Sequence, residues 1–90
     1  MFLIVYDVAD GGRLRRVAKV CEDYGVRIQK SVFECDLDAS TFQRFWSLLV
    51  KALDAKFDSL VAYPLCSSCL DKVKTAGVVH REAPSSVYVA

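Results

Sequence analysis

Residues 2–17 read FLIVYDVADGGRLRRV, and their hydrophobic pattern changes from that of a strand to that of a helix. The run over residues 2–8 is apolar except for Asp7, and its length and β-branched content are typical of a buried strand. Residues 10–12, DGG, are typical of a turn. From Arg13 onward, apolar residues recur on one helix face: Leu14, Val17, Ala18, Cys21 and Tyr24. The chain therefore begins with a strand, a turn and an amphipathic helix.

Two further strands follow this helix. Gly25 stands where a C-cap glycine ends a helix. Residues 26–29 and 33–37 then alternate apolar and polar side chains, with a short break at Lys30 and Ser31. This pattern predicts two strands joined by a tight turn, each with one buried face.

A second helix and a fourth strand complete the first 65 residues. Ser40 and Gln43 match the capping-box pattern, which predicts a helix that starts at Ser40. Its apolar side chains recur at helical spacing and are expected in the core: Phe42, Phe45, Trp46, Leu49, Val50 and Leu53. A strand is predicted over residues 58–65, and Pro64 places it at a sheet edge because proline cannot donate to the ladder. Residues 66–74 have room for one or two helical turns.

The predicted order is strand, helix, strand, strand, helix, strand. Two interleaved right-handed crossovers of this kind produce a ferredoxin-like βαββαβ sandwich. This is an α+β fold with a four-stranded antiparallel sheet, the first and third strands at its centre, and both helices on one face. We predict this domain over residues 1–81, followed by a C-terminal linker and strand over residues 82–90. The other sheet face needs a cover, which a two-fold partner or a nucleic acid could supply.

Composition and charge narrow the class of protein. The chain has 90 residues, 53% hydrophobic and 26% charged, as expected of one globular domain. No apolar run reaches the roughly 18 residues that span a bilayer, and no basic region precedes the apolar start. We therefore expect a cytoplasmic protein without a membrane partner. Residues 13–30 hold six basic and two acidic side chains, whereas the rest of the chain holds six basic and nine acidic ones.

This local basic patch has two interpretations. A cluster of cations on the exposed face of a helix can simply be solvated. It can also bind the phosphate backbone of a nucleic acid, without sequence preference and more weakly as salt rises. The candidate nucleic-acid-binding residues are Arg13, Arg15, Arg16, Lys19, Arg27 and Lys30.

Asp7 is the candidate for chemistry, because a carboxylate that ends a buried strand needs a hydrogen bond, a charged partner or a cation. Spacing alone favours a structural acid that is bound by the amides of Gly11 or Gly12 or by Arg16. The alternative is a ligand of Mg²⁺, or of another divalent cation such as Mn²⁺, with Asp10 as an outer ligand. Mg²⁺ takes only one or two protein ligands, so a two-fold dimer that joins two copies of Asp7 would complete such a site.

Cys66 and Cys69 form a single CxxC motif with three interpretations. A structural zinc site needs four ligands, and only His80 and the buried-looking Cys21 and Cys35 remain to complete one. A redox role is the second alternative. Packing of small side chains around a short helix is the interpretation that the sequence favours.

Several segments together resemble one family. They are YDVAD at 6–10, R-x-x-R at 13–16, YGVRIQKSVFECDL at 24–37 and YPLC at 63–66. The chain resembles the CRISPR-associated Cas-two family, the small adaptation nucleases encoded beside CRISPR arrays. The resemblance covers essentially the whole chain, and YGVRIQKSVFE is its most specific part.

The resemblance implies a two-fold homodimer of ferredoxin-like protomers that exchange their C-terminal strands. It implies a metal-dependent endonuclease that cleaves RNA or double-stranded DNA during spacer acquisition, with Asp7 as the catalytic residue and metal ligand. Residues that fall at family-motif positions are Tyr6, Asp10, Arg13, Arg16, Arg27, Ser31 and Phe33.

Two other functions remain open. In other members of this family the dimer bridges subunits of the Cas-one integrase, which implies a non-catalytic DNA-binding adaptor. A toxin-like ribonuclease on the same fold is the third hypothesis, and it would share the fold but not the YGVRIQKSVFE segment.

Overall fold

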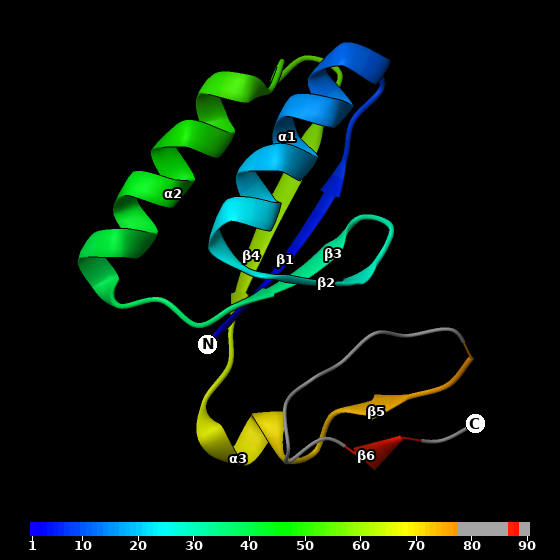
Figure 1. The fold of residues 1–90 in the computed structure, drawn as a ribbon, viewed down its shortest axis with the longest axis vertical. Helices are drawn as coiled ribbons and strands as arrows, with labels where there is room; N and C mark the ends of the chain where they lie inside the picture. The colour runs from blue at the N-terminus through cyan, green and yellow to red at the C-terminus, as the bar shows by residue number, and fades with distance from the viewer. Residues whose placement is uncertain (78–86, 89–90) are drawn as a thin grey trace.

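The structure is a computed structural model that describes residues 1–77 and 87–88. Figure 1 shows two long helices side by side on one face of a sheet, with a smaller C-terminal unit beyond one end of the sheet. The elements are β1 (Phe2–Asp7), α1 (Gly11–Tyr24), β2 (Val26–Gln29), β3 (Val32–Cys35), α2 (Ala39–Ala52), β4 (Ser59–Pro64), α3 (Ser67–Leu70), β5 (Lys74–Thr75) and β6 (Val87–Tyr88).

The main sheet has the strand order β2-β3-β1-β4, and all its neighbours are antiparallel. The predicted ferredoxin-like α+β fold is therefore confirmed, with the first and third strands at the centre. Pro64 pairs with Phe2 at the end of β4, which is an edge strand as its proline predicted. Within residues 1–77 and 87–88, no helix is long and apolar enough to cross a membrane.

The core lies between the sheet and the two long helices. Ile4 and Tyr6 alternate along β1 and are almost wholly buried. The other buried members come from α1, β3 and α2: Val17, Cys21, Phe33, Cys35, Phe45 and Leu49. Because side chains alternate across a strand, Leu3, Val5 and Asp7 lie on the opposite face of β1, which neither α1 nor α2 covers. We call this the open face.

Both long helices begin earlier than the sequence predicted, because an aspartate caps each one. The Asp10 carboxylate accepts a hydrogen bond from the amide of Arg13 at 2.9 Å, so Gly11 and Gly12 belong to the helix and not to a turn. The predicted capping box at Ser40 is wrong as well. Asp38 is the N-cap of α2, and its carboxylate accepts from the amide of Thr41 at 2.8 Å.

The predicted alternation of the second strand is also wrong in part. The register of β2 against β3 shifts between Arg27 and Gln29, which is the signature of a bulge. Val26 is 42% exposed, whereas Arg27 lies opposite the buried Phe33. On α2, Val50 was expected in the core but is 51% exposed.

The C-terminal strand forms, and it pairs within its own chain. β6 runs parallel to β5, with Lys74 opposite Val87 and Thr75 opposite Tyr88. The pairing of this strand with a dimer partner stays a prediction. The predicted linker at 82–86 and the last two residues lie outside the described residues, and so does His80.

Gly25 is required by close packing. It ends α1 with extended backbone angles, and its amide donates to the Cys21 carbonyl at 2.9 Å. A Cβ atom at this position would collide with the carbonyl oxygen of Glu34 and with the sulfur of Cys35. The chain therefore needs glycine where the end of α1 packs against β3.

We expect Gly25→Ala to lower the free energy of unfolding by about 1–3 kcal/mol, because the new methyl group overpacks this contact. Gly11→Ala is the matched control, since a Cβ there meets only Arg15 at 3.7 Å. That substitution should instead stabilise the protein by about 0.4–1 kcal/mol. Urea unfolding of both variants measures the difference. An unchanged free energy of unfolding for Gly25→Ala would contradict the packing argument.

Candidate functional site

Asp7 is a free carboxylate on the open face. It is the last residue of β1, it lies opposite Ser59 of β4, and it is exposed. Its side chain makes no hydrogen bond or ion pair with any part of the chain that the structure describes. The predicted structural bonds to Gly11, Gly12 or Arg16 are therefore not formed. The carboxylate remains available for a ligand from outside the protomer.

Asp10, the proposed outer ligand, already has a structural role. The hydrogen bond from the Arg13 amide lowers the pKa of its carboxyl group, so Asp10 is charged at the start of α1. A negative charge at this position is favourable because the unpaired amides of the first helical turn point toward it. Its part in metal binding stays a prediction.

Arg13 forms the shortest ion pair among the described residues. Its Nε and Nη2 atoms donate to the two carboxylate oxygens of Asp58 at 2.8 and 3.2 Å. The Asp58 side chain has no exposed surface, and it also accepts from the amides of Ala9 and Asp54. The Arg13 guanidinium lowers the pKa of Asp58 far below its usual value, with help from the Asp54 amide. Arg13 thus joins the first turn of α1 to the turn before β4.

Sequence reasoning missed Asp58 because its partners are remote. Arg13 stands 45 residues earlier in the chain, so no local spacing links the two side chains. The only signal was an acid directly before an apolar strand. Its role as a buried acceptor depends on how the two loops meet.

The predicted residues around the β2–β3 turn form one network. Tyr6 stacks against Phe33, and its hydroxyl donates to the Lys30 carbonyl at 3.3 Å. The amide of Tyr6 donates to the carbonyl of Ser31 at 3.1 Å. Burial raises the pKa of the Tyr6 hydroxyl, so it stays protonated and can donate. These contacts hold the turn against β1.

Arg27 belongs to the same network. Its guanidinium lies 5.0 Å from the centre of the Phe33 ring, forms an ion pair with Glu22 at 3.0 Å, and donates to the Lys30 carbonyl at 3.4 Å. This residue therefore has several partners within its own chain. Its predicted contact with a nucleic acid is not tested by these distances.

The side chains of the remaining basic residues form fewer ion pairs. Lys19 forms an exposed ion pair with Asp23 at 3.1 Å, which stabilises a helix only weakly. Arg15, Arg16 and Lys30 have no acidic partner within residues 1–77 and 87–88. Three of the six predicted cations thus form no ion pair within the part of the chain that the structure describes.

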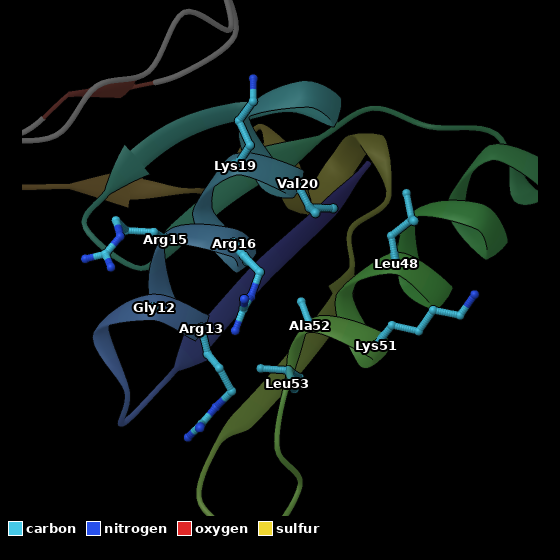
Figure 2. Close-up of a pocket in the computed structure, with 10 residues that line it drawn as sticks. All are labelled: Gly12, Arg13, Arg15, Arg16, Lys19, Val20, Leu48, Lys51, Ala52 and Leu53. Carbon is cyan, nitrogen blue, oxygen red and sulfur yellow. The ribbon is translucent and has the colours of Figure 1, made fainter.

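Arg15, Arg16 and Lys19 lie along a shallow groove of about 740 Å³ between α1 and α2. Figure 2 shows these side chains on α1, with Leu48 and Lys51 across from them on α2. We call this the helix groove. It lies on the helix layer, whereas Asp7 lies on the open face of the sheet. The structure therefore does not bring these cations together with Asp7.

Comparison with known families assigns most of the chain. A family model described as CRISPR associated protein Cas2 matches residues 1–73. The chain belongs to the Cas2 family. The CRISPR-associated endoribonuclease Cas2 1 of Moorella thermoacetica is 42% identical over 81 residues, which cover 84% of each chain. The CRISPR-associated endonuclease Cas2 of Halalkalibacterium halodurans is 42% identical over 82 residues, or 86% of this chain and 85% of that protein.

Two solved structures share the fold as well. The crystal structure of Streptococcus pyogenes Cas2 at pH 6.5 superposes with a TM-score of 0.77 and 40% sequence identity. The match covers 84% of this chain and 98% of that one. A hypothetical protein from Thermus thermophilus matches with a TM-score of 0.79 and 31% identity, over 89% of this chain and 93% of its own.

The Asp58 carboxylate predicts a specific dependence of stability on pH. Its pKa is lower in the folded protein than in the unfolded chain, where it is about 3.9. Its contribution to stability is therefore complete above that value and is lost as the pH falls toward the folded pKa. We expect Asp58→Asn to melt several degrees below wild type at about pH 6 to 8.

This difference in melting temperature should narrow below about pH 4, where the unfolded chain already protonates Asp58. Asp36→Asn is the control, because the Asp36 side chain is 87% exposed. It should melt like the wild type throughout. Thermal scans of the three proteins across this pH range make the measurement, and a gap that stays constant in acid would count against the role of the Asp58 charge.

Proposed function

We propose that the protein is a metal-dependent endonuclease that cleaves phosphodiester bonds in RNA or double-stranded DNA in the cytoplasm, during CRISPR spacer acquisition. The observation that carries the proposal is the exposed Asp7 carboxylate, which has no partner among the described residues. The family adds support, since curated Cas2 relatives are named endoribonucleases or endonucleases. A free carboxylate at a strand end is suited to bind a cation.

The donor set supports a metal that is shared between two copies of the chain. Within residues 1–77 and 87–88, no three His, Cys, Asp or Glu side chains are grouped as metal ligands would be. Asp7 alone fits Mg²⁺ or Mn²⁺, because Mg²⁺ takes one or two carboxylates and fills its other positions with water and substrate phosphate. When bound, the ion would neutralise charge on the phosphate and lower the pKa of a bound water.

We infer a homodimer whose protomers approach each other through the open face. Val61 and Tyr63 of β4 lie on that face and are 40% and 51% exposed, although they are large apolar side chains. A second copy would bury them and bring the two Asp7 residues together. We further infer that residues 82–90 pair with the partner protomer, as the resemblance to the family implies.

In this proposal, different residues bind the metal and the nucleic acid. Asp7 would bind and orient the cation beside the scissile phosphate. Arg15 and Arg16 would hold other phosphates of the same nucleic acid, because their guanidinium groups have no acidic partner among the described residues. Binding and cleavage would thus depend on different surfaces of the protein.

We expect Asp7→Asn to reduce metal-dependent cleavage by at least about 100-fold, since even partners that only touch a metal ligand are worth 10–100-fold. Binding of the same substrate should stay within about twofold of wild type, because the cations that hold phosphate are unchanged. Labelled single-stranded RNA and duplex DNA, each with Mg²⁺ or with EDTA, provide the assay. Asp36→Asn is the matched control and should cleave normally.

Equal cleavage by wild type and Asp7→Asn would show that Asp7 is not part of the active site. Cleavage that persists in EDTA would show that the reaction does not need a metal ion.

A second candidate function is a non-catalytic adaptor that binds duplex DNA and bridges subunits of the Cas-one integrase. The observation that favours it is the distance in the fold between the basic helix groove and Asp7, which allows DNA binding without a contribution from the open face. In this hypothesis, Asp7→Asn leaves spacer acquisition in cells intact, whereas deletion of residues 82–90 stops it.

We expect Arg15→Ala and Arg16→Ala each to weaken binding of duplex DNA and to reduce the dependence of log K on log salt by about one. Arg44→Ala is the matched control, since Arg44 is an exposed arginine of α2 that lies outside the helix groove. Titrations at several salt concentrations measure both effects. Unchanged binding by both variants would exclude Arg15 and Arg16 as the phosphate-binding residues.

A further inference from the structure

Two exposed thiols lie side by side where the chain leaves the main sheet. Cys66 is the N-cap of α3, the short helix between β4 and β5, and Cys69 lies within that helix. Their sulfur atoms are 3.3 Å apart. The amide of Leu70 donates to the Cys66 carbonyl at 2.9 Å, which holds the turn in this shape. Both thiols are free and open to solvent.

This arrangement bears on the three interpretations of the CxxC motif. Packing of small side chains, which the sequence favoured, is wrong because both cysteines are exposed. A zinc site needs four ligands, and no third His, Cys, Asp or Glu joins the pair within residues 1–77 and 87–88. The two adjacent and exposed thiols favour a dithiol that can be oxidised.

We propose that Cys66 and Cys69 form a reversible intrachain disulfide by exchange with a small disulfide of the glutathione class. The two sulfurs need only move from 3.3 Å to a bond length of about 2.05 Å, within a turn that already holds them together. In a reducing compartment such a bond is transient, as expected of a redox-sensitive site.

The exchange balances in two steps. The Cys66 thiol loses its proton to solvent, and its thiolate attacks one sulfur of the small disulfide and displaces the first small thiolate. The Cys69 thiol also loses its proton to solvent, and its sulfur attacks the Cys66 sulfur and displaces the second small thiolate. The displaced thiolates take up two protons. The protein dithiol is oxidised to a disulfide, and the small disulfide is reduced to two thiols.

The surroundings of the four cysteines support this assignment. The Ser68 hydroxyl, 3.2 Å from the Cys66 sulfur, and the Cys69 amide lower the pKa of the Cys66 thiol to about 7. Burial raises the pKa of Cys21 to about 12 and that of Cys35 to about 11. Because the thiolate is the reactive form, Cys66 is the cysteine most suited to begin an exchange.

The position of the pair gives the disulfide a structural consequence. The turn that holds it leads from Pro64 to Val73, and Val73 lines a cavity of about 350 Å³ together with Leu3 and Val5 of the open face. A covalent link across the turn would restrict the path along which the C-terminal segment meets the sheet. This inference does not depend on the nuclease proposal.

The test uses the full-length protein in glutathione buffers that range from fully reduced to fully oxidised. Free thiols are then blocked, and the tryptic peptides are weighed. We expect the peptide over residues 57–72, which holds both cysteines, to carry two blocking groups after reduced buffer. After oxidised buffer it should carry none and weigh two hydrogens less than the free dithiol, and dithiothreitol before blocking should restore both groups. Cys21 and Cys35 serve as internal controls and should stay free thiols.

Two variants separate the roles of the thiols. Cys69→Ser should accumulate a stable glutathione adduct on Cys66, because the second thiol is missing. Cys66→Ser should react at least about tenfold more slowly, since the Ser68 hydroxyl lies 3.2 Å from the Cys66 sulfur and the remaining Cys69 thiol has no such contact among the described residues. A lasting glutathione adduct on the wild-type protein, a disulfide between two chains on a non-reducing gel, or no oxidation at all would overturn the proposal.

Discussion

One end of the fold, where β1 leads into α1, depends on the bonds of the buried Asp58 carboxylate. It is charged although its side chain has no exposed surface, because Arg13 and two amides replace the water that it would otherwise bind. One of those amides belongs to Ala9, two residues after Asp7. The same carboxylate therefore positions the end of β1, the start of α1 and the turn into β4. Asp58 is thus bonded two residues from Asp7, the candidate catalytic residue.

The fold could be predicted from the sequence because the core residues recur at the regular spacings of strands and helices. Alternation along residues 2–8 places Ile4 and Tyr6 on one face, and helical spacing places Val17, Cys21, Phe45 and Leu49 against them. The order of elements then left one compact arrangement of strands and helices. Most of the information needed for these predictions is local.

The details that were missed depend on contacts between distant residues or on choices between similar ones. Asp38 and Ser40 are both suitable helix caps, and in the structure Asp38 caps α2. The bulge in β2 inserts one residue into a pattern, VRIQ, that reads as regular alternation. The partner of Arg13 is remote in sequence. The separation between Asp7 and the basic helix face likewise requires the orientation of α1 on the sheet, which no local pattern contains.

The bulge has a further consequence for how the sheet can grow. A sheet of four strands has two edges, and strands from other chains add most readily to an edge that is flat and regular. The irregular register at Arg27 and Gln29 twists the β2 edge and makes it a poor template. The β4 edge keeps an unbroken register against β1 from Ser59 to Pro64. Main-chain hydrogen bonding to a neighbouring molecule is thereby directed to one side of the protein, and growth of the sheet on both sides into open-ended aggregates is disfavoured.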